Sequence, residues 1–182
     1  MSSSLFLRSG FAVAASAATL AATLVFTACK KDEPVAAPDT TDRDLSTDTR
    51  AATGFTWFGK ADSLRAKSSG SGHNTPWLRT RYNALAAAQL DAAGRVRAGA
   101  VFATGALIVK ELHPTRTGGL TEYAVMRKDP TNANAAANGW VWAYLKADGT
   151  VSISATQKGT GCVGCHAQAD HIDATLMNKF FR

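Results

Sequence analysis

The sequence lacks any concentrated run of positive charge. Its 20 Lys and Arg residues outnumber its 14 Asp and Glu residues. The basic residues stand singly or in pairs, such as Arg79/Arg81 and Arg95/Arg97, without interleaved aromatic residues. Proteins that bind single-stranded nucleic acid combine a basic groove with stacking aromatics. The pattern therefore argues against a nucleic-acid partner and favours a solvated basic face. Docking to an acidic redox partner is the alternative interpretation.

The first 28 residues almost lack charge, because Arg8 is their only charged side chain and the rest are rich in Ala, Thr, Leu and Val. We interpret residues 1–28 as a signal peptide of the lipoprotein type, since Cys29 follows directly and charged residues come next. Phe26 stands where such cleavage sites usually carry Leu. Cys29 would carry a lipid that holds the protein on the membrane in the periplasm. The alternative is that residues 11–29 stay uncut as a membrane anchor, because their run is about as long as a bilayer requires.

Residues 29–50 nearly lack large apolar side chains and are dense in Asp, Thr and Pro. A segment of this composition cannot bury enough apolar surface to offset the entropy of ordering the chain. We therefore expect a disordered linker at residues 29–50. It would connect the membrane anchor to one folded domain at residues 51–182.

The folded domain lacks internal repeats and shows both helical and extended patterns. Thr75 and Pro76 form a capping signal that predicts a helix over residues 77–92. A continuous apolar run predicts a buried strand over residues 101–112, bent at Gly105. Further strands and a C-terminal helix are expected at residues 121–127, 140–146, 150–154 and 170–181, with a hairpin turn at 147–149. These elements predict an α+β fold, mainly an antiparallel β-sheet with flanking helices.

Two cysteines and a histidine stand close together in GCVGCH at residues 161–166, and 16 residues follow them. Cys-x-x-Cys-His is the attachment motif of c-type haem. Cysteines at this spacing can bond to the two vinyl groups of one porphyrin, and the next residue presents its imidazole to the iron as the proximal ligand. The motif predicts one covalent haem c on Cys162 and Cys165, with His166 as the metal ligand. The end of the domain is therefore expected to be a haem-attachment segment.

Three other uses of the motif have less support in the sequence. A zinc site would need a fourth ligand such as His171 or His113, and the chain has no second cysteine pair of the kind that common zinc modules use. A thioredoxin-like redox pair would need the motif at the start of a helix near the front of an α/β unit. A structural disulfide is sterically awkward at this spacing and leaves His166 without a role.

The sequence also lacks an obvious ligand for the distal side of an iron. Only residues 167–182 follow the motif, and we expect Met177 among them to lie on the proximal side. The upstream candidates are His73, His113 and Met126. We expect His73, in a Ser/Gly-rich loop, and His113, at a strand end, to be surface residues. An open distal iron site follows, and the alternative is a six-coordinate electron-transfer cytochrome without a substrate.

From about residue 71 to its C-terminus, the chain resembles the cytochrome P-460 family, which includes the cytochromes c′-beta. The resemblance rests on four ordered segments, TGALIVKEL at 104–112, VMRK at 125–128, GWVW at 139–142 and CVGCH at 162–166. It implies a mainly antiparallel β fold, often dimeric, with one c-type haem and small nitrogen ligands above the iron. Some members oxidise hydroxylamine, and others bind NO or CO. The chain is thus expected to perform redox chemistry on such species or to bind them.

Lys110 is the residue that the resemblance singles out beyond the haem motif. The oxidising members carry a lysine bonded covalently to the haem edge, and Lys110 matches its position. Strand alternation also directs Lys110 to the same side as Ile108 and Leu112, an apolar face where a lone ammonium is unfavourable. The alternative is that Lys110 and Glu111 mark the point where the strand emerges into solvent.

The oxidising members also place a carboxylate above the iron, where it takes protons from bound hydroxylamine as a general base. Gln157 occupies about that place in the sequence, and an amide cannot perform this role. Catalysis by this chain is therefore left open. A hydrophobic gas pocket is the other use of the distal space, with four aromatic residues that could line it or belong to the core: Phe55, Phe58, Phe102 and Trp142.

Overall fold

The computed structural model describes residues 40–51 and 53–182. The expected signal peptide at residues 1–28 and the expected lipid carrier Cys29 lie outside these described residues. Within the described ranges, the helices are all too short or too polar to cross a membrane.

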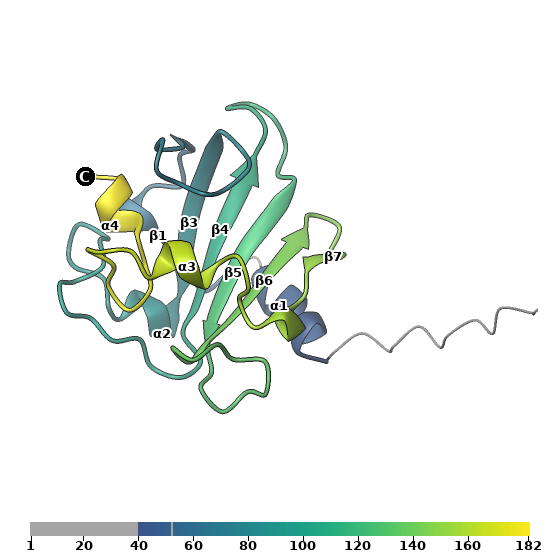
Figure 1. Cartoon of the computed structure of the whole chain (residues 1–182). Coiled ribbons are helices and arrows are strands. Elements are labelled where there is room, and N and C mark those ends of the chain that lie inside the picture. Colours follow the sequence, from purple (N-terminus) through teal and green to yellow (C-terminus); the bar gives the residue numbers. More distant parts are fainter. Residues whose placement is uncertain (1–39, 52) are drawn as a thin grey trace, which may run out of the picture. The chain divides into compact units, whose positions relative to one another are not determined.

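In the part of the chain that the structure describes, seven strands form one sheet in which every pair is antiparallel (Figure 1). Six strands follow the order β1-β3-β4-β5-β6-β7, and β2 pairs with the other end of β3. This architecture confirms the prediction of an α+β fold with a mainly antiparallel sheet. The strands are β1 (Phe55–Trp57), β2 (Arg65–Ala66), β3 (Trp77–Asn83), β4 (Leu107–His113), β5 (Glu122–Lys128), β6 (Trp140–Lys146) and β7 (Val151–Ile153).

Short helices cover the two faces of the sheet, and the sheet separates two apolar clusters. On one face, Leu45 of α1 packs against Val109, Val125 and Val141 of the central strands. On the other face, the segment with α3 and α4 packs against alternate residues of the same strands, and Figure 1 shows α3 crossing the near face of the sheet. The α-helices are α1 (Thr40–Thr49), α2 (Ala84–Ala87), α3 (Val163–His166) and α4 (Met177–Phe180), and the 3-10 helices are η1 (Phe58–Lys60) and η2 (Ala155–Gln157).

The α1 helix corrects the expectation of a disordered linker up to residue 50. Leu45 is fully buried, although it is the only large apolar residue of the helix. Asp42 is also buried, and its carboxylate accepts hydrogen bonds from the Ala155 amide at 2.8 Å and the Ser154 hydroxyl at 2.6 Å. One leucine and one satisfied carboxylate are enough to dock the helix, so the expectation from composition was wrong for Thr40–Thr49.

The predicted helix over residues 77–92 is wrong for most of its length. Its first part is strand β3, and only Ala84–Ala87 are helical. Leu78 and Tyr82 stand four residues apart, a spacing that fits one face of a helix and also one face of a strand. The strand ends at Asn83, whose side-chain oxygen caps α2 by accepting from the Ala86 amide at 3.0 Å.

The other sequence-based strands agree with the structure to within a few residues. β5, β6 and β7 match the three predictions, and the turn at residues 147–149 joins β6 to β7 as an antiparallel pair. The predicted strand at 101–112 starts later, because Gly105 turns the chain at a φ of 87° before β4 begins at Leu107. The predicted C-terminal helix shrinks to α4, since Asp173 and Ala174 have positive φ angles that a helix does not accept.

A buried ion cluster joins α1 to the sheet on the face that α1 covers. Glu111 of β4 is 5% exposed and pairs with Arg79 at 2.6 Å and with Arg81 at 3.0 Å. Arg81 also donates to the carbonyl oxygens of Thr49 at 2.6 Å and Ala51 at 3.0 Å, at the end of α1. Removing one member of such a cluster leaves an uncompensated charge in a dry environment.

We expect Glu111→Gln to lower the free energy of unfolding by about 3 kcal/mol, because both arginines lose their counter-charge. Denaturant titration at pH 7 measures the change. Glu122→Gln is the matched control, since Glu122 is only half-buried at the start of β5, and we expect its effect to stay within about 0.5 kcal/mol. Equal stability of the two variants would contradict a structural role for the cluster.

Candidate functional site

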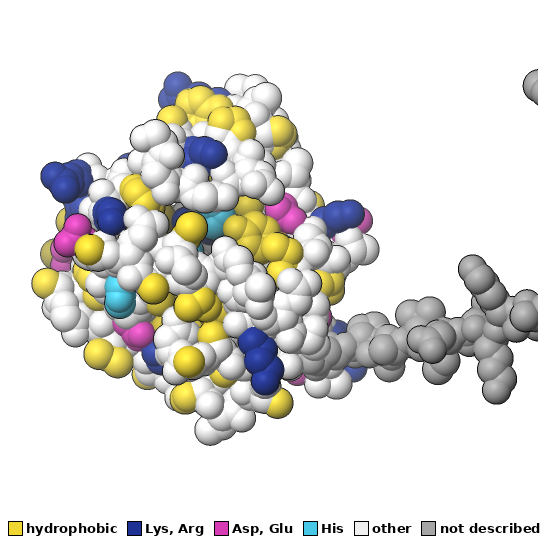
Figure 2. All heavy atoms as spheres, in the orientation of Figure 1, with side chains coloured by type: hydrophobic (Ala, Val, Ile, Leu, Met, Phe, Trp, Pro, Cys, Tyr) yellow, Lys and Arg dark blue, Asp and Glu magenta, His cyan; other side chains and the backbone are white. Residues whose placement is uncertain are grey.

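A cavity lies on the face of the sheet that α3 and α4 cover. The strand register aligns two rows of side chains across β3 to β6, and these rows form its floor. The empty space of the cavity, counted together with the part that is open to solvent, is about 870 Å³. Figure 2 shows hydrophobic and histidine side chains meeting near the middle of this face, with Lys and Arg side chains scattered around them. The floor consists of Thr80, Lys110, Ala124 and Tyr144 in one row and of Tyr82, Ile108, Met126 and Trp142 in the next.

The Cys-x-x-Cys-His segment forms one wall of the cavity. Its residues make a single helical turn in which the His166 amide donates to the Cys162 carbonyl at 3.1 Å, and Cys162, Cys165 and His166 all line the cavity. Both thiols are free, and Cys165 is exposed whereas Cys162 is half-buried. Gly159 permits the close approach of this segment to the sheet, because it has a φ of 73° and a Cβ there would lie 2.5 Å from the Trp142 ring.

His166 is held in one tautomer and one orientation. Its Nδ1 lies 2.6 Å from the carbonyl oxygen of Ala174, and this oxygen can only accept, so Nδ1 carries the proton. Nε2 therefore has a free lone pair, and the edge of the Trp142 ring supports the imidazole at 4.7 Å between centroids. Burial lowers the pKa of His166 to about 4, so the ring is neutral at pH 7. A neutral imidazole with a fixed Nδ1–H is the form that ligates a metal.

Asp173 fixes the carbonyl that orients His166. Its carboxylate receives the Lys128 ammonium at 2.8 Å, the Trp140 indole N–H at 3.2 Å and the Phe102 amide at 2.9 Å. The neighbouring Ala174 has a φ of 66°, an unfavourable angle for a residue with a side chain. The contacts of Asp173 offset this strain and hold the Ala174 carbonyl toward the proximal imidazole.

Lys110 points into the cavity from the middle of its floor, as strand alternation predicts. It lies in the same row as Thr80 and Tyr144, and its ammonium is 2.8 Å from Nε2 of His73. Desolvation lowers the pKa of Lys110 to about 8. The alternative, in which Lys110 marks the emergence of the strand into solvent, is wrong because β4 continues to His113.

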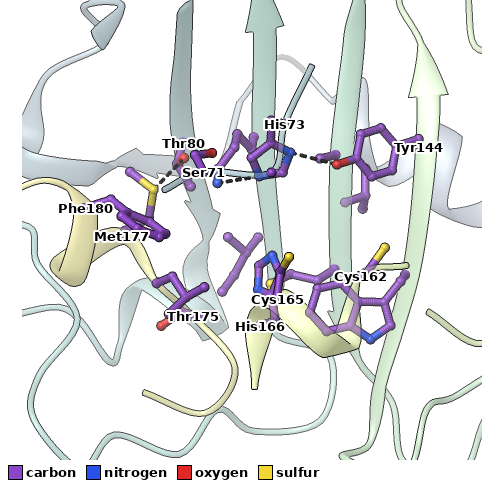
Figure 3. A pocket seen from close by; sticks show the side chains of 18 of the residues that line it. Ser71, His73, Thr80, Tyr144, Cys162, Cys165, His166, Thr175, Met177 and Phe180 are labelled. Atoms are coloured by element: carbon purple, nitrogen blue, oxygen red, sulfur yellow. Dashed lines mark hydrogen bonds between the residues drawn. The ribbon is translucent and has the colours of Figure 1, made fainter. Parts of the chain in front are cut away.

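His73 corrects the expectation of a surface residue. It is 9% exposed and lines the cavity, where its Nδ1 lies 2.7 Å from the Tyr144 hydroxyl and its ring centroid lies 6.5 Å from that of His166 (Figure 3). Desolvation, followed by the charge of Lys110, lowers the pKa of His73 to about 2. An ammonium can only donate, so Nε2 of the neutral His73 accepts from Lys110 and Nδ1–H donates to Tyr144.

The remaining candidates from the sequence divide between the cavity and other places. Met126 lies in the floor, and Met177 lines the wall, where its sulfur accepts a hydrogen bond from Thr80 at 3.3 Å. His113 is also buried instead of exposed, but it belongs to the ion cluster, with Nε2 at 3.9 Å from Glu111. Among the four aromatic candidates, Trp142 lines the cavity, Phe58 and Phe102 lie in the adjoining core, and Phe55 packs on the opposite face.

Tyr144 and Thr80 are cavity residues that the sequence did not reveal. Tyr144 lies in a predicted strand, but an aromatic residue there is usually ordinary core, and only the register of β5 and β6 shows its place. Thr80 was assigned to a helix, so its alternation with Leu78 and Tyr82 carried no information. The walls of the cavity, as far as the structure describes them, contain no carboxylate, and Gln157 does not contribute to them.

The zinc alternative finds no support in the described residues, where no group of three or more His, Cys, Asp and Glu side chains converges on a metal position. His171 accepts a hydrogen bond from the Ala174 amide at 3.1 Å.

The family model of Cytochrome P460 matches residues 79–176, which is more than half of the 182 residues. The chain belongs to the cytochrome P460 family. No curated protein and no solved structure matches it at a significant level.

Membership of the cytochrome P460 family makes this a haem protein, and the site suits a haem. The donor set of two free thiols and one neutral imidazole with an available Nε2 lone pair lies on one wall of a largely apolar cavity. Tyr82 and Trp142 add buried polar atoms that have no hydrogen-bond partner among the described residues. Such atoms are expected where a bound group or water completes the structure.

We expect Asp173→Asn to lower the free energy of unfolding by about 2 kcal/mol, because the partly buried Lys128 loses its counter-charge. Chemical denaturation of wild type and variant measures the loss. Asp170→Asn is the control, since Asp170 also has a positive φ but an exposed side chain, and its effect should remain within about 0.5 kcal/mol. An Asp173→Asn variant with the same free energy of unfolding as the wild type would show that the carboxylate does not support the His166 segment.

The two thiols of the haem-free protein should react at different rates. Desolvation, followed by the nearby Cys165, raises the pKa of Cys162, so Cys162 holds less thiolate at a given pH. At pH 8, iodoacetamide should therefore alkylate the exposed Cys165 faster than Cys162. The difference between the two alkylation rates should become smaller as the pH rises. Mass spectrometry of peptides from a reduced, time-resolved reaction gives both rates. Faster alkylation of Cys162 would contradict the burial of its sulfur.

Proposed function

We propose that the protein is an exported c-type monohaem cytochrome in which Cys162 and Cys165 attach the haem and His166 ligates its iron. The observation that supports this most strongly is the 2.6 Å contact from His166 Nδ1 to the Ala174 carbonyl, which leaves Nε2 free beside two unpaired thiols. When bound, the haem supplies an iron centre that can exchange electrons or hold a small ligand.

We infer that the cavity serves small nitrogen species such as hydroxylamine or NO. Its walls are mostly apolar, and they carry a few convergent polar groups on one side, namely His73, Lys110 and Tyr144. This combination of apolar walls and few polar groups is typical of small-ligand sites. The lack of a carboxylate in the described walls removes the usual general base for hydroxylamine oxidation, so it favours ligand binding over turnover.

Lys110 is the residue proposed to bond to the haem edge. With a pKa of about 8, a fraction of it is free amine near neutral pH, and the free amine is the nucleophilic form. Such a bond would replace one N–H of Lys110 and one C–H of the macrocycle, and the two electrons and two protons released would pass to an oxidant of the peroxide class. The position of Lys110 in the cavity floor supports this role.

The proposed cellular location rests on the sequence alone. Residues 1–28 are proposed to direct export, and Cys29 is proposed to carry the lipid that anchors the protein in the periplasm. Radiolabelled palmitate incorporated into wild type and absent from Cys29→Ser would support the lipid anchor. Equal labelling of both proteins would refute it.

Electron transfer by a permanently six-coordinate haem is the second candidate function. One observation favours it, because His73 brings another imidazole into the cavity that holds His166. A haem with two permanent protein ligands would transfer electrons without binding CO or NO. Gas binding by the ferrous protein therefore separates the two functions.

The test of the proposed function uses full-length protein from a host competent in cytochrome maturation. We expect haem staining to survive denaturing electrophoresis, and to be lost or strongly reduced in the double variant Cys162→Ala/Cys165→Ala. His113→Gln, a buried histidine outside the cavity, should retain the stain. Protein that folds without haem in this host would refute the proposal.

Peptide mass spectrometry and kinetics test the role of Lys110. A cross-link predicts that trypsin fails to cut after Lys110 and that the Lys110 peptide remains joined to the peptide with Cys162 and Cys165. Hydroxylamine-dependent reduction of an added acceptor, compared with Lys110→Ala, then measures turnover. Ordinary cleavage and no turnover would leave gas binding as the function and exclude catalysis.

A further inference from the structure

A second imidazole lies at the distance that iron ligation from two sides requires. The ring centroids of His73 and His166 are 6.5 Å apart. Two imidazoles that share one metal, each with a metal–nitrogen bond of about 2 Å and a ring centre about 1 Å behind the nitrogen, have centroids roughly 6 Å apart. Figure 3 shows His73 and His166 one above the other in the cavity, on segments that are far apart in the chain.

The two histidines also have the same pattern of hydrogen bonds and the same tautomer. In each, Nδ1 donates to an oxygen, the Ala174 carbonyl for His166 and the Tyr144 hydroxyl for His73, so Nε2 carries the lone pair. Metal-ligating histidines almost always donate their other N–H to such a partner, which fixes the ring and its tautomer. His73 thus has the features of a ligand, not those of a core histidine.

The backbone also holds His73 over the cavity. The Lys67 ammonium donates to the His73 carbonyl at 2.7 Å, and the loop before His73 packs close to Cys165, where a Cβ on Gly72 would lie 3.6 Å from the sulfur. Gly70 lies against the Phe180 ring on the other side. The His73 loop and the motif segment are therefore neighbours across the cavity.

His73 differs from a permanent ligand because its Nε2 has another partner. In the structure, Lys110 donates to this nitrogen at 2.8 Å, so an imidazole released from iron keeps both of its hydrogen bonds. A buried polar group that loses its partner is strongly unfavourable, and this alternative partner removes that penalty. A released His73 then has no unpaired ring nitrogen, which lets an incoming ligand displace it.

We propose that His73 is a second, displaceable axial ligand, which occupies the iron in the resting protein and yields to NO, CO or a small nitrogen substrate. This inference rests on the haem attachment proposed above. It makes ligand binding conditional, because an external ligand binds only to the fraction of molecules in which His73 has left the iron. Tyr144 acts through His73 as a positioning residue.

Ligand kinetics on the wild-type holoprotein test the proposal without a substitution. When His73 must leave first, the observed rate of CO binding to the ferrous protein levels off at high CO concentration, at the rate of His73 release. A rate that rises linearly over the whole range shows an open site and refutes the proposal. No CO binding at all shows a permanent ligand and refutes it equally.

Spectroscopy of His73→Ala gives an independent readout. We expect the ferric wild type to show a low-spin electron paramagnetic resonance signal, and the variant to become high-spin and to return to low-spin with added imidazole. CO association should accelerate about tenfold or more, since the competent fraction approaches one. His113→Gln should leave spectrum and rate unchanged.

The two proposals fail in different ways. Colourless wild-type protein would refute haem attachment, and this inference with it. A haem-loaded wild type and His73→Ala with identical high-spin spectra would refute the role of His73 alone. If His73→Ala does not fold, the CO kinetics of the wild type still decide between the outcomes.

Discussion

The hydrogen bond from His166 to the Ala174 carbonyl is the interaction on which the site depends. It selects the tautomer that leaves Nε2 available, and it joins the motif to the segment that follows it. Because the carbonyl belongs to a residue with a positive φ, its direction requires the contacts that Asp173 makes with the sheet. The orientation of one imidazole is thus determined by Lys128 and Trp140, which are far from it in sequence.

The two faces of the sheet treat charge in opposite ways. On the α1 face, Glu111 pairs with two arginines, and one of them, Arg81, also binds the end of α1. On the cavity face, Lys110 has no carboxylate partner among the described residues and instead donates to a neutral imidazole. Residues 110 and 111 are neighbours in the chain, and the alternation of a strand directs one to structure and the other to chemistry.

The sequence predicted those parts of the fold and site that local patterns determine. The strands at β5 and β6 show clear patterns, the motif spacing is specific, and alternation gave the direction of Lys110 correctly. β3 was misassigned because Leu78 and Tyr82 fit both periods, and the burial of His73 depends on packing between a loop and the sheet. Such packing joins distant residues and leaves no local pattern to detect. The place of Tyr144 depends on strand register in the same way, and Thr80 escaped notice because its strand fits the pattern of a helix.

The C-terminal wall of the cavity consists of two helices of four residues each, α3 and α4, which are too short to be stable by themselves. Every strand of the described sheet precedes Cys162 in the chain, so the ribosome completes the floor before it makes this wall. If haem attaches to Cys162 and Cys165 as proposed, it would stabilise the packing of this late segment on the finished sheet. The prosthetic group would then order the same segment that supplies its ligand.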